Sequence, residues 1–277
     1  MDEEIVVLGI EETSVFITQE KTLYSDYLER KVIIDIYKPK TRDTEGEFPL
    51  LLINDGQDLR KMNFEEILNS MFSTEDLEPF VAVGIHCSND RINEYGTICR
   101  ADYNGRGAKA GLYNKFILEE LLPFLKIELK INSFKEKAFA GFSLGGLSAL
   151  DIVWNNATEF TETGVFSGSL WWRRRGYEDE GYNWDKDRIM HLQVQKGKYC
   201  AWLKFFFECG RLDETADRNN NGIIDSIEDT LDLIEDMKAI GYADEQIHYT
   251  ELEDGRHNVE TWARAFPEFL KWGWGRR

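Results

Sequence analysis

The chain has 277 residues, of which 42% are hydrophobic and 13% aromatic, and it carries a formal net charge of −18. This composition supplies a sizeable core and fits one α/β domain over residues 1–277. The acidic surface would repel nucleic-acid phosphates and anionic membranes, and no stretch has the length of a membrane-spanning helix. We therefore expect neither a nucleic-acid nor a membrane partner.

The cysteines show neither close pairing nor metal-type spacing, which favours a reduced chain. The first residues, Met1-Asp-Glu-Glu4, lack the basic-then-apolar order of a signal peptide, which predicts a cytoplasmic protein. A signal removed earlier would instead allow a periplasmic or secreted one.

The pattern of apolar residues predicts alternating strands and helices. Residues 5–18 and 31–37 alternate apolar and polar, so residues 1–30 are assigned to N-terminal edge strands. Continuously apolar runs at 50–53 and 80–85 are typical of strands buried in a parallel sheet. Further strands are expected at Phe139, 164–166, 203–208 and 247–252, and helices at 63–72, 112–129, 143–154, 230–240 and 258–272. The order predicts a mostly parallel sheet with helices on both faces, and residues 171–200 are interpreted as an irregular insertion near the site.

The pentapeptide Gly141-Phe-Ser-Leu-Gly145 lies between an apolar strand and a helix. In this context a serine stands on a sharp turn that exposes its hydroxyl, and flanking side chains would collide with the strand and the helix. Ser143 is therefore the predicted nucleophile, and the backbone N–H of Leu144 is a predicted oxyanion donor. A serine that only caps the helix is the alternative.

A serine nucleophile needs a base and an acid that orients the base. His257 lies in a polar loop between the last strand and the last helix, and it is the predicted base. His86 and His248 are interpreted as structural, and His191 is unassigned. Asp213 follows a strand between the serine and the histidine, so it is the predicted acid. Glu208, Glu214 and Asp217 are the alternatives.

Asn54-Asp-Gly-Gln57 follows an early strand, where a second oxyanion donor is expected. The N–H of Gln57 is the candidate, with an ordinary Asp-Gly turn as the alternative. Arg91 and Glu94 are interpreted as a structural pair near the mouth of the cleft.

Several motifs occur in a fixed order along residues 30–272. They are Asn54-Asp-Gly-Gln57, Arg91-Ile-Asn-Glu-Tyr95, Gly141-Phe-Ser-Leu-Gly-Gly146, Val165-Phe-Ser-Gly-Ser-Leu-Trp171, Cys209-Gly-Arg-Leu-Asp213 and Gly255-Arg-His257. Together they resemble the putative-esterase family of α/β-hydrolases, which includes enterochelin esterases, feruloyl esterases and esterase D. The resemblance implies an α/β-hydrolase fold, no organic cofactor, and a triad of Ser143, Asp213 and His257. It also implies a cleft bordered by Trp171 and Trp172.

Residues 217–228 match the calcium loop of an EF-hand. The oxygen ligands would come from Asp217, Asn219, Asn221, the Ile223 carbonyl, Asp225 and Glu228, with Gly222 at the sharp turn. We expect a structural Ca²⁺ ion that orders the nearby Asp213. The alternative is an Asx-rich turn that caps the next helix.

The leading hypothesis is a serine carboxylesterase acting on a small ester or on a carbohydrate- or siderophore-type ester. An acyltransferase with the same triad and a catalytically silent, calcium-stabilised binding module are the alternatives. Trp171, Trp172 and Arg91 are candidate substrate contacts, and Arg173-Arg174-Arg175 is a candidate site for an anionic group of the substrate. The oligomeric state is not predicted.

Overall fold

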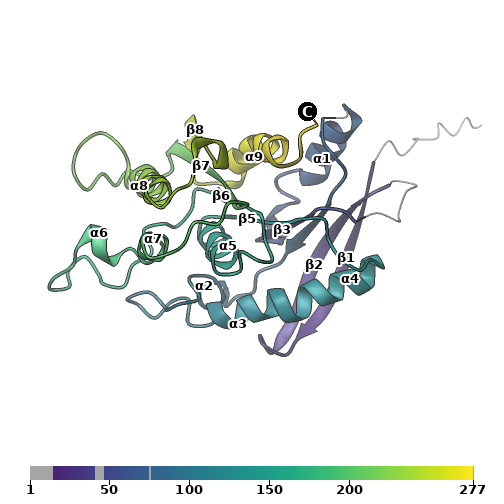
Figure 1. Cartoon of the computed structure of the whole chain (residues 1–277), viewed down its shortest axis with the longest axis horizontal. Helices are drawn as coiled ribbons and strands as arrows, with labels where there is room; N and C mark the ends of the chain where they lie inside the picture. Colours follow the sequence, from purple (N-terminus) through teal and green to yellow (C-terminus); the bar gives the residue numbers. More distant parts are fainter. Residues whose placement is uncertain (1–14, 41–46, 75, 277) are drawn as a thin grey trace, which may run out of the picture.

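The computed structural model describes residues 15–40, 47–74 and 76–276. Eight strands form one sheet in the order β1-β2-β4-β3-β5-β6-β7-β8 (Figure 1). Their bounds are β1 Phe16–Ser25, β2 Arg30–Pro39, β3 Leu50–Asn54, β4 Val81–Ile85, β5 Lys137–Phe142, β6 Glu162–Phe166, β7 Lys204–Leu212 and β8 Ile247–Arg256. The strands from β4 to β8 pair in parallel. The prediction of a mostly parallel sheet is confirmed.

The N-terminal hairpin forms the antiparallel edge of the sheet. β1 pairs with β2, and β2 pairs with β4, both antiparallel. Residues 5–14 of the strand expected at 5–18 lie outside the described residues, and β1 begins at Phe16. Every residue of β3 and β4 is buried, as the continuous apolar runs predict.

Helices cover both faces of the sheet (Figure 1). Their bounds are η1 Gly56–Asp58, α1 Phe64–Ser73, α2 Arg91–Glu94, α3 Ala110–Lys115, η2 Phe116–Leu121, α4 Leu122–Leu129, α5 Leu144–Asn155, α6 Trp184–Asp187, α7 Ile189–Gln195, α8 Asp225–Ala239, η3 Asp244–Gln246 and α9 Val259–Trp274. One apolar core joins α1 and α9 to the sheet, and a second joins the α3–α4 segment, α5, α7 and α8 to its other face. No described helix is long and apolar enough to cross a membrane.

Two expected elements differ from the structure. The helix expected at 112–129 is interrupted by the π-helical turn η2, which ends just before Pro123. Residues 171–200 are not irregular throughout, because α7 lies within them and packs against α8. Its buried face includes Met190 and Val194, a spacing of four that continues the apolar core.

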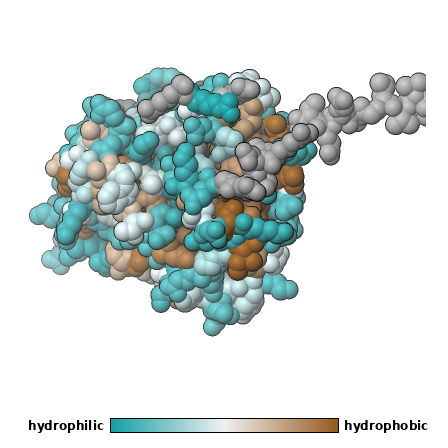
Figure 2. All heavy atoms as spheres, turned by 45° about the vertical axis from the view of Figure 1, so that its right-hand side comes forward, coloured by the Kyte–Doolittle hydropathy of each residue, from teal (hydrophilic) through white to brown (hydrophobic). Residues whose placement is uncertain are grey.

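Polar and charged side chains cover most of the face seen in Figure 2, and hydrophobic side chains form scattered patches on it.

Candidate active site

Ser143 stands on the turn between β5 and α5 with backbone angles of φ 53° and ψ −122°. A non-glycine residue adopts this region only under strain, and such strain gathers at functional sites. The neighbouring strand β6 stabilises this turn, because the N–H of Ser143 donates to the carbonyl of Phe166 over 2.9 Å. The hydroxyl of Ser143 lies 3.5 Å from that of Ser169. The predicted sharp strand-to-helix turn is confirmed.

Both glycines of the pentapeptide are required by close packing. A Cβ at Gly141 would overlap the backbone of Gly145, and a Cβ at Gly145 would lie 2.5 Å from Asp55 Oδ2. Asn54 braces the same turn, because its side-chain amide donates to the Gly145 carbonyl over 2.8 Å. The loop after β3 therefore packs directly against the serine turn.

Asp213 follows β7 directly, and His257 lies in the short turn between β8 and α9. Both line a cavity of about 220 Å³. The remaining lining residues are Ser167, Gly168, Trp171, Glu214 and Ser226. A Cβ at Gly210 would lie 2.5 Å from the carbonyl carbon of Gly255, so β7 and β8 are in backbone contact just before these two side chains. Glycine at both positions permits this approach.

Trp262 connects the histidine to the serine turn. Its ring lies edge-on to His257 with centroids 5.4 Å apart and stacks on Phe142, the neighbour of Ser143, at 5.1 Å. No hydrogen bond joins Ser143 to His257, or His257 to Asp213, within the described residues. Such bonds are often long in free enzymes and tighten when substrate binds. The structure brings the three side chains to one edge of the sheet, and their roles as a triad stay a prediction.

Desolvation affects the ionisation of this pair, although the His257 side chain is exposed and Asp213 is only half-buried. It lowers the pKa of His257 below 6.5, against the opposing effect of the nearby Asp213 charge. The imidazole is therefore neutral near pH 7 and can accept a proton. Burial raises the pKa of Asp213, while the Ser167 hydroxyl, the Gly210 N–H and the His257 charge act in the opposite direction.

The alternative acid Glu208 lies inside β7 and is 1% exposed. Burial, together with repulsion by Asp213, raises the pKa of Glu208 to about 8. This environment disfavours the charged form of Glu208, which favours Asp213 as the orienting acid.

Sequence reasoning gave no role to Ser167, although it lies in the motif after β6. Ser167 has a left-handed backbone (φ 46°), its N–H donates to the carbonyl of Glu208, and its hydroxyl accepts from Trp262 Nε1 over 2.9 Å. Its hydroxyl also acts on the pKa of Asp213. The two serines flanking Gly168 at the end of a central strand were the signal that could have identified it.

The two oxyanion candidates lie where the sequence places them. Leu144 is the first residue of α5, where backbone N–H groups lack partners within the helix. Gln57 lies in η1, and its side chain is held by Cys87: Nε2 is 3.2 Å from Sγ, and Oε1 accepts from the Cys87 N–H. The role of their N–H groups stays a prediction.

The expected Arg91–Glu94 pair is wrong. Arg91 binds both carboxylate oxygens of Asp55, at 2.6 and 2.7 Å, and reaches the Phe142 carbonyl at 3.4 Å. Glu94 instead binds Arg30 through two bonds of 2.7 and 2.6 Å. Arg91 thus connects the loop after β3 to the serine turn, and its role as a substrate contact stays a prediction.

Of the two candidate tryptophans, Trp171 lines the cavity with Asp213 and His257. Trp172 is fully buried against Gly96 and Gly107, so its assignment as a substrate contact is wrong. The two rings lie in contact, with centroids 5.7 Å apart, so the buried Trp172 packs against the Trp171 ring.

The arginine run 173–175 does not form one anion site. Arg173 is buried, with its guanidinium 3.7 Å from the centroid of the Tyr177 ring. Arg174 binds the buried Asp187 over 2.6 Å, and Arg175 donates to the Gly181 carbonyl. The run holds the insertion together.

The loop 217–228 closes on itself. Asp217 accepts from the N–H groups of Asn221 and Gly222, and the amides of Asn219 and Asn221 both donate to Glu228 Oε1, at 2.7 and 2.6 Å. Gly222 has the left-handed backbone (φ 86°) expected at the sharp turn.

Arg218 occupies the acidic side of this loop. Its guanidinium lies 2.8 Å from Asp229, 3.1 Å from Glu228 and 3.5 Å from Asp225. No group of three His, Cys, Asp or Glu side chains suited to a metal occurs in the part of the chain that the structure describes. The predicted calcium site is not shown by this arrangement.

A serine on a strained strand-to-helix turn, at the carboxyl edge of a mostly parallel eight-stranded sheet, defines an α/β-hydrolase. A family model described as "Putative esterase" matches residues 25–272, and the chain belongs to this family. This family description points to ester hydrolysis as the activity to be tested.

Several solved structures share the fold. The enterobactin esterase from Shigella flexneri is 21% identical with a TM-score of 0.71, over 92% of this chain and 58% of that one. A ferulic acid esterase is 16% identical with a TM-score of 0.68, over 92% and 97% of the two chains. An IroE-like serine hydrolase from Shewanella oneidensis is 18% identical with a TM-score of 0.67, over 93% and 79%.

The chain spans only 58% of the length of the enterobactin esterase that it resembles. A search of curated proteins found no relative that matches the chain.

Proposed function

We propose that this esterase cleaves its substrate through an acyl-enzyme formed on Ser143, with His257 as base and Asp213 as orienting acid. The strained backbone of Ser143 is the observation that carries the proposal, because such strain persists only where the surroundings enforce it. His257, whose pKa lies below 6.5, takes the serine proton as the hydroxyl attacks the ester carbonyl. The N–H groups of Leu144 and Gln57 then hold the oxyanion, and water releases the acid.

For the substrate we propose a small ester with an aromatic acid or a siderophore-type group. The half-buried Trp171 in the cavity supports an aromatic group, since its ring can stack on one. Two solved relatives of the same fold are named as an enterobactin esterase and a ferulic acid esterase, which supports the same class.

A fluorophosphonate probe and an ester panel test the proposed function together. We expect covalent labelling of Ser143, and release of the free acid from an acetyl, a feruloyl or a 2,3-dihydroxybenzoyl ester. An added alcohol acceptor separates hydrolysis from acyl transfer, because transfer would give a new ester in place of the acid. Labelling at another residue, or turnover without labelling, would contradict the proposed nucleophile.

We also propose that the loop 217–228 binds Ca²⁺. Its oxygen donors have the number and spacing that Ca²⁺ requires. Rotation of the Asn219 and Asn221 amides by half a turn would direct their oxygens to the point that their NH₂ groups now face. Bound Ca²⁺ would neutralise the loop carboxylates and displace Arg218 from Glu228.

The loop is connected to the proposed acid. The carboxylate of Glu214, next to Asp213, accepts from the N–H of Ser226 over 2.7 Å, and both residues line the cavity. Ordering of the loop would therefore hold the segment that carries Asp213.

Adding Ca²⁺ is expected to raise the melting temperature by several degrees, because a ligand at about 100 times its Kd adds about 2.7 kcal/mol of stability. Glu228→Gln should abolish the shift. Glu235 is an exposed acid on α8 that pairs with Lys238 and lies outside the loop. Glu235→Gln should therefore leave the Ca²⁺-induced shift in melting temperature unchanged. Differential scanning calorimetry with Ca²⁺ and with a chelator measures both. If Ca²⁺ does not change the melting temperature of the unsubstituted protein, the loop is an Asx-rich turn that caps α8 and not a calcium site.

A further inference from the structure

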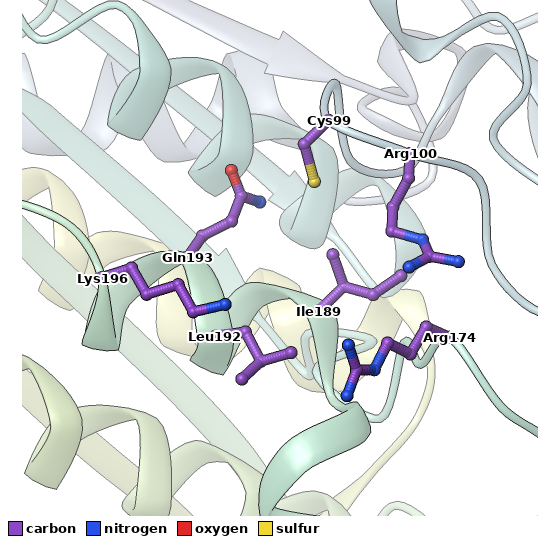
Figure 3. Close-up of a pocket in the computed structure, with 7 residues that line it drawn as sticks. All are labelled: Cys99, Arg100, Arg174, Ile189, Leu192, Gln193 and Lys196. Carbon is purple, nitrogen blue, oxygen red and sulfur yellow. The ribbon is translucent and has the colours of Figure 1, made fainter.

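A second cavity, of about 290 Å³, lies between α7 and the loop at residues 97–100 (Figure 3). Its lining residues are Cys99, Arg100, Arg174, Ile189, Leu192, Gln193 and Lys196. None of them lines the cavity of Asp213 and His257. This volume is close to the lower end of the range for ligand pockets, about 300–1,000 Å³, so a small molecule would fill it.

The charge of this cavity is opposite to that of the whole protein. Three cationic side chains and no acidic one line it, although the chain carries a net charge of −18. Neither Arg100 nor Lys196 forms an ion pair within the described residues, whereas Arg174 is held by the buried Asp187. Figure 3 shows the three cationic groups around Ile189 and Leu192. Cations without local partners favour an anionic ligand.

The cavity also has an apolar side, formed by Ile189 and Leu192 of α7. A bare inorganic anion would leave these side chains without a contact. A ligand with both a negative group and a hydrocarbon body would use the whole lining, since apolar contact area adds to the charge interaction.

The walls are joined beneath the cavity by a buried carboxylate. Asp151 accepts from Gln193 Nε2 of α7 over 2.6 Å and from the N–H of Ile98 over 2.7 Å. Asp151 is fully buried, so these bonds fix α7 to the loop that carries Arg100. A cavity that is already formed loses little ordering entropy when a ligand enters.

We propose that this cavity binds a small organic carboxylate, with its charged group between Arg100, Arg174 and Lys196 and its hydrocarbon part on Ile189 and Leu192. This site is separate from the proposed catalytic one, and ligand binding there does not depend on the esterase mechanism.

Calorimetric titration with benzoate tests the proposal, with benzamide and inorganic phosphate as comparison ligands. Benzoate should bind, and benzamide, which has the same shape without the charge, should bind at least about tenfold more weakly, a difference of ~1.4 kcal/mol. Phosphate should also bind more weakly, because it has no apolar part. Added salt should weaken the binding of benzoate.

Arg100→Gln combined with Lys196→Gln should weaken benzoate binding by about tenfold or more, since charge-assisted hydrogen bonds are lost. Lys198→Gln removes a charge two residues away that does not line the cavity, and it should bind as the unsubstituted protein does. The single variant Arg100→Lys, which keeps the charge, serves if the double variant loses its fold, and it should retain most of the affinity.

Three results would overturn the proposal. One is the absence of benzoate binding at concentrations up to about 10 mM. A Kd above that value would correspond to less than about 3 kcal/mol of binding free energy, too little for a specific site. Another is equal binding by the double variant, which would place benzoate elsewhere on the protein. The third is phosphate binding as tightly as benzoate, which would reduce the site to a general anion patch.

Discussion

Replacing Ser143 with alanine is expected to lower kcat for a short-chain ester by about 10³–10⁶-fold, with the fold intact. The hydroxyl is the group that would form the acyl-enzyme, and alanine removes it. The strained turn is enforced by its neighbours, including the carbonyl of Phe166 and the close glycines, so alanine can occupy the same position. Release of a chromogenic alcohol measures the loss, and circular dichroism checks the fold.

Ser169 supplies the matched control, because its hydroxyl lies only 3.5 Å from that of Ser143 and is buried. Ser169→Ala should remain within about tenfold of the unsubstituted rate, since the loss is that of one ordinary hydrogen bond. If Ser169→Ala abolished turnover while Ser143→Ala remained active, the nucleophile would have been assigned to the wrong serine.

Replacing Asp213 with asparagine is expected to lower kcat by about 10⁴-fold, because the imidazole loses the carboxylate that fixes its tautomer. The substitution should also move the pH profile. The Asp213 charge raises the pKa of His257, so its removal lowers that pKa further below 6.5. The acid limb of kcat/KM, where activity falls as His257 becomes protonated, should therefore shift to lower pH.

Glu214 provides the comparison for this second substitution, since it lines the same cavity and its charge also raises the pKa of His257. Glu214→Gln should shift the acid limb in the same direction with a much smaller loss of kcat. An equal loss in both variants would mean that Glu214, one of the alternatives from the sequence, orients the histidine.

The serine turn and the sheet could be predicted because their causes are local. Gly141 and Gly145 are needed by contacts within one turn, and a continuously apolar run such as Leu50–Ile53 has few other uses than a buried strand. These patterns are visible in any single sequence.

Contacts between distant residues could not be predicted in the same way. Arg91 and Glu94 are neighbours on one helical turn, yet each binds a residue from another part of the chain, Asp55 and Arg30. Spacing suggested their pairing, but tertiary packing determined it. The loop at 217–228 shows the same limit, because Arg218 at the second position of the motif turns back onto its acidic residues.

The backbone contact between Gly210 and Gly255 couples the two loops that follow them. Because β7 and β8 touch here, we expect the carboxylate of Asp213 and the imidazole of His257 to move together if that edge of the sheet shifts. The distance between these two side chains would then stay the same, while their distance to the Ser143 hydroxyl, on the turn after β5, would change. If Asp213 and His257 are the proposed acid and base, such a motion would change their alignment with the serine without separating them from each other.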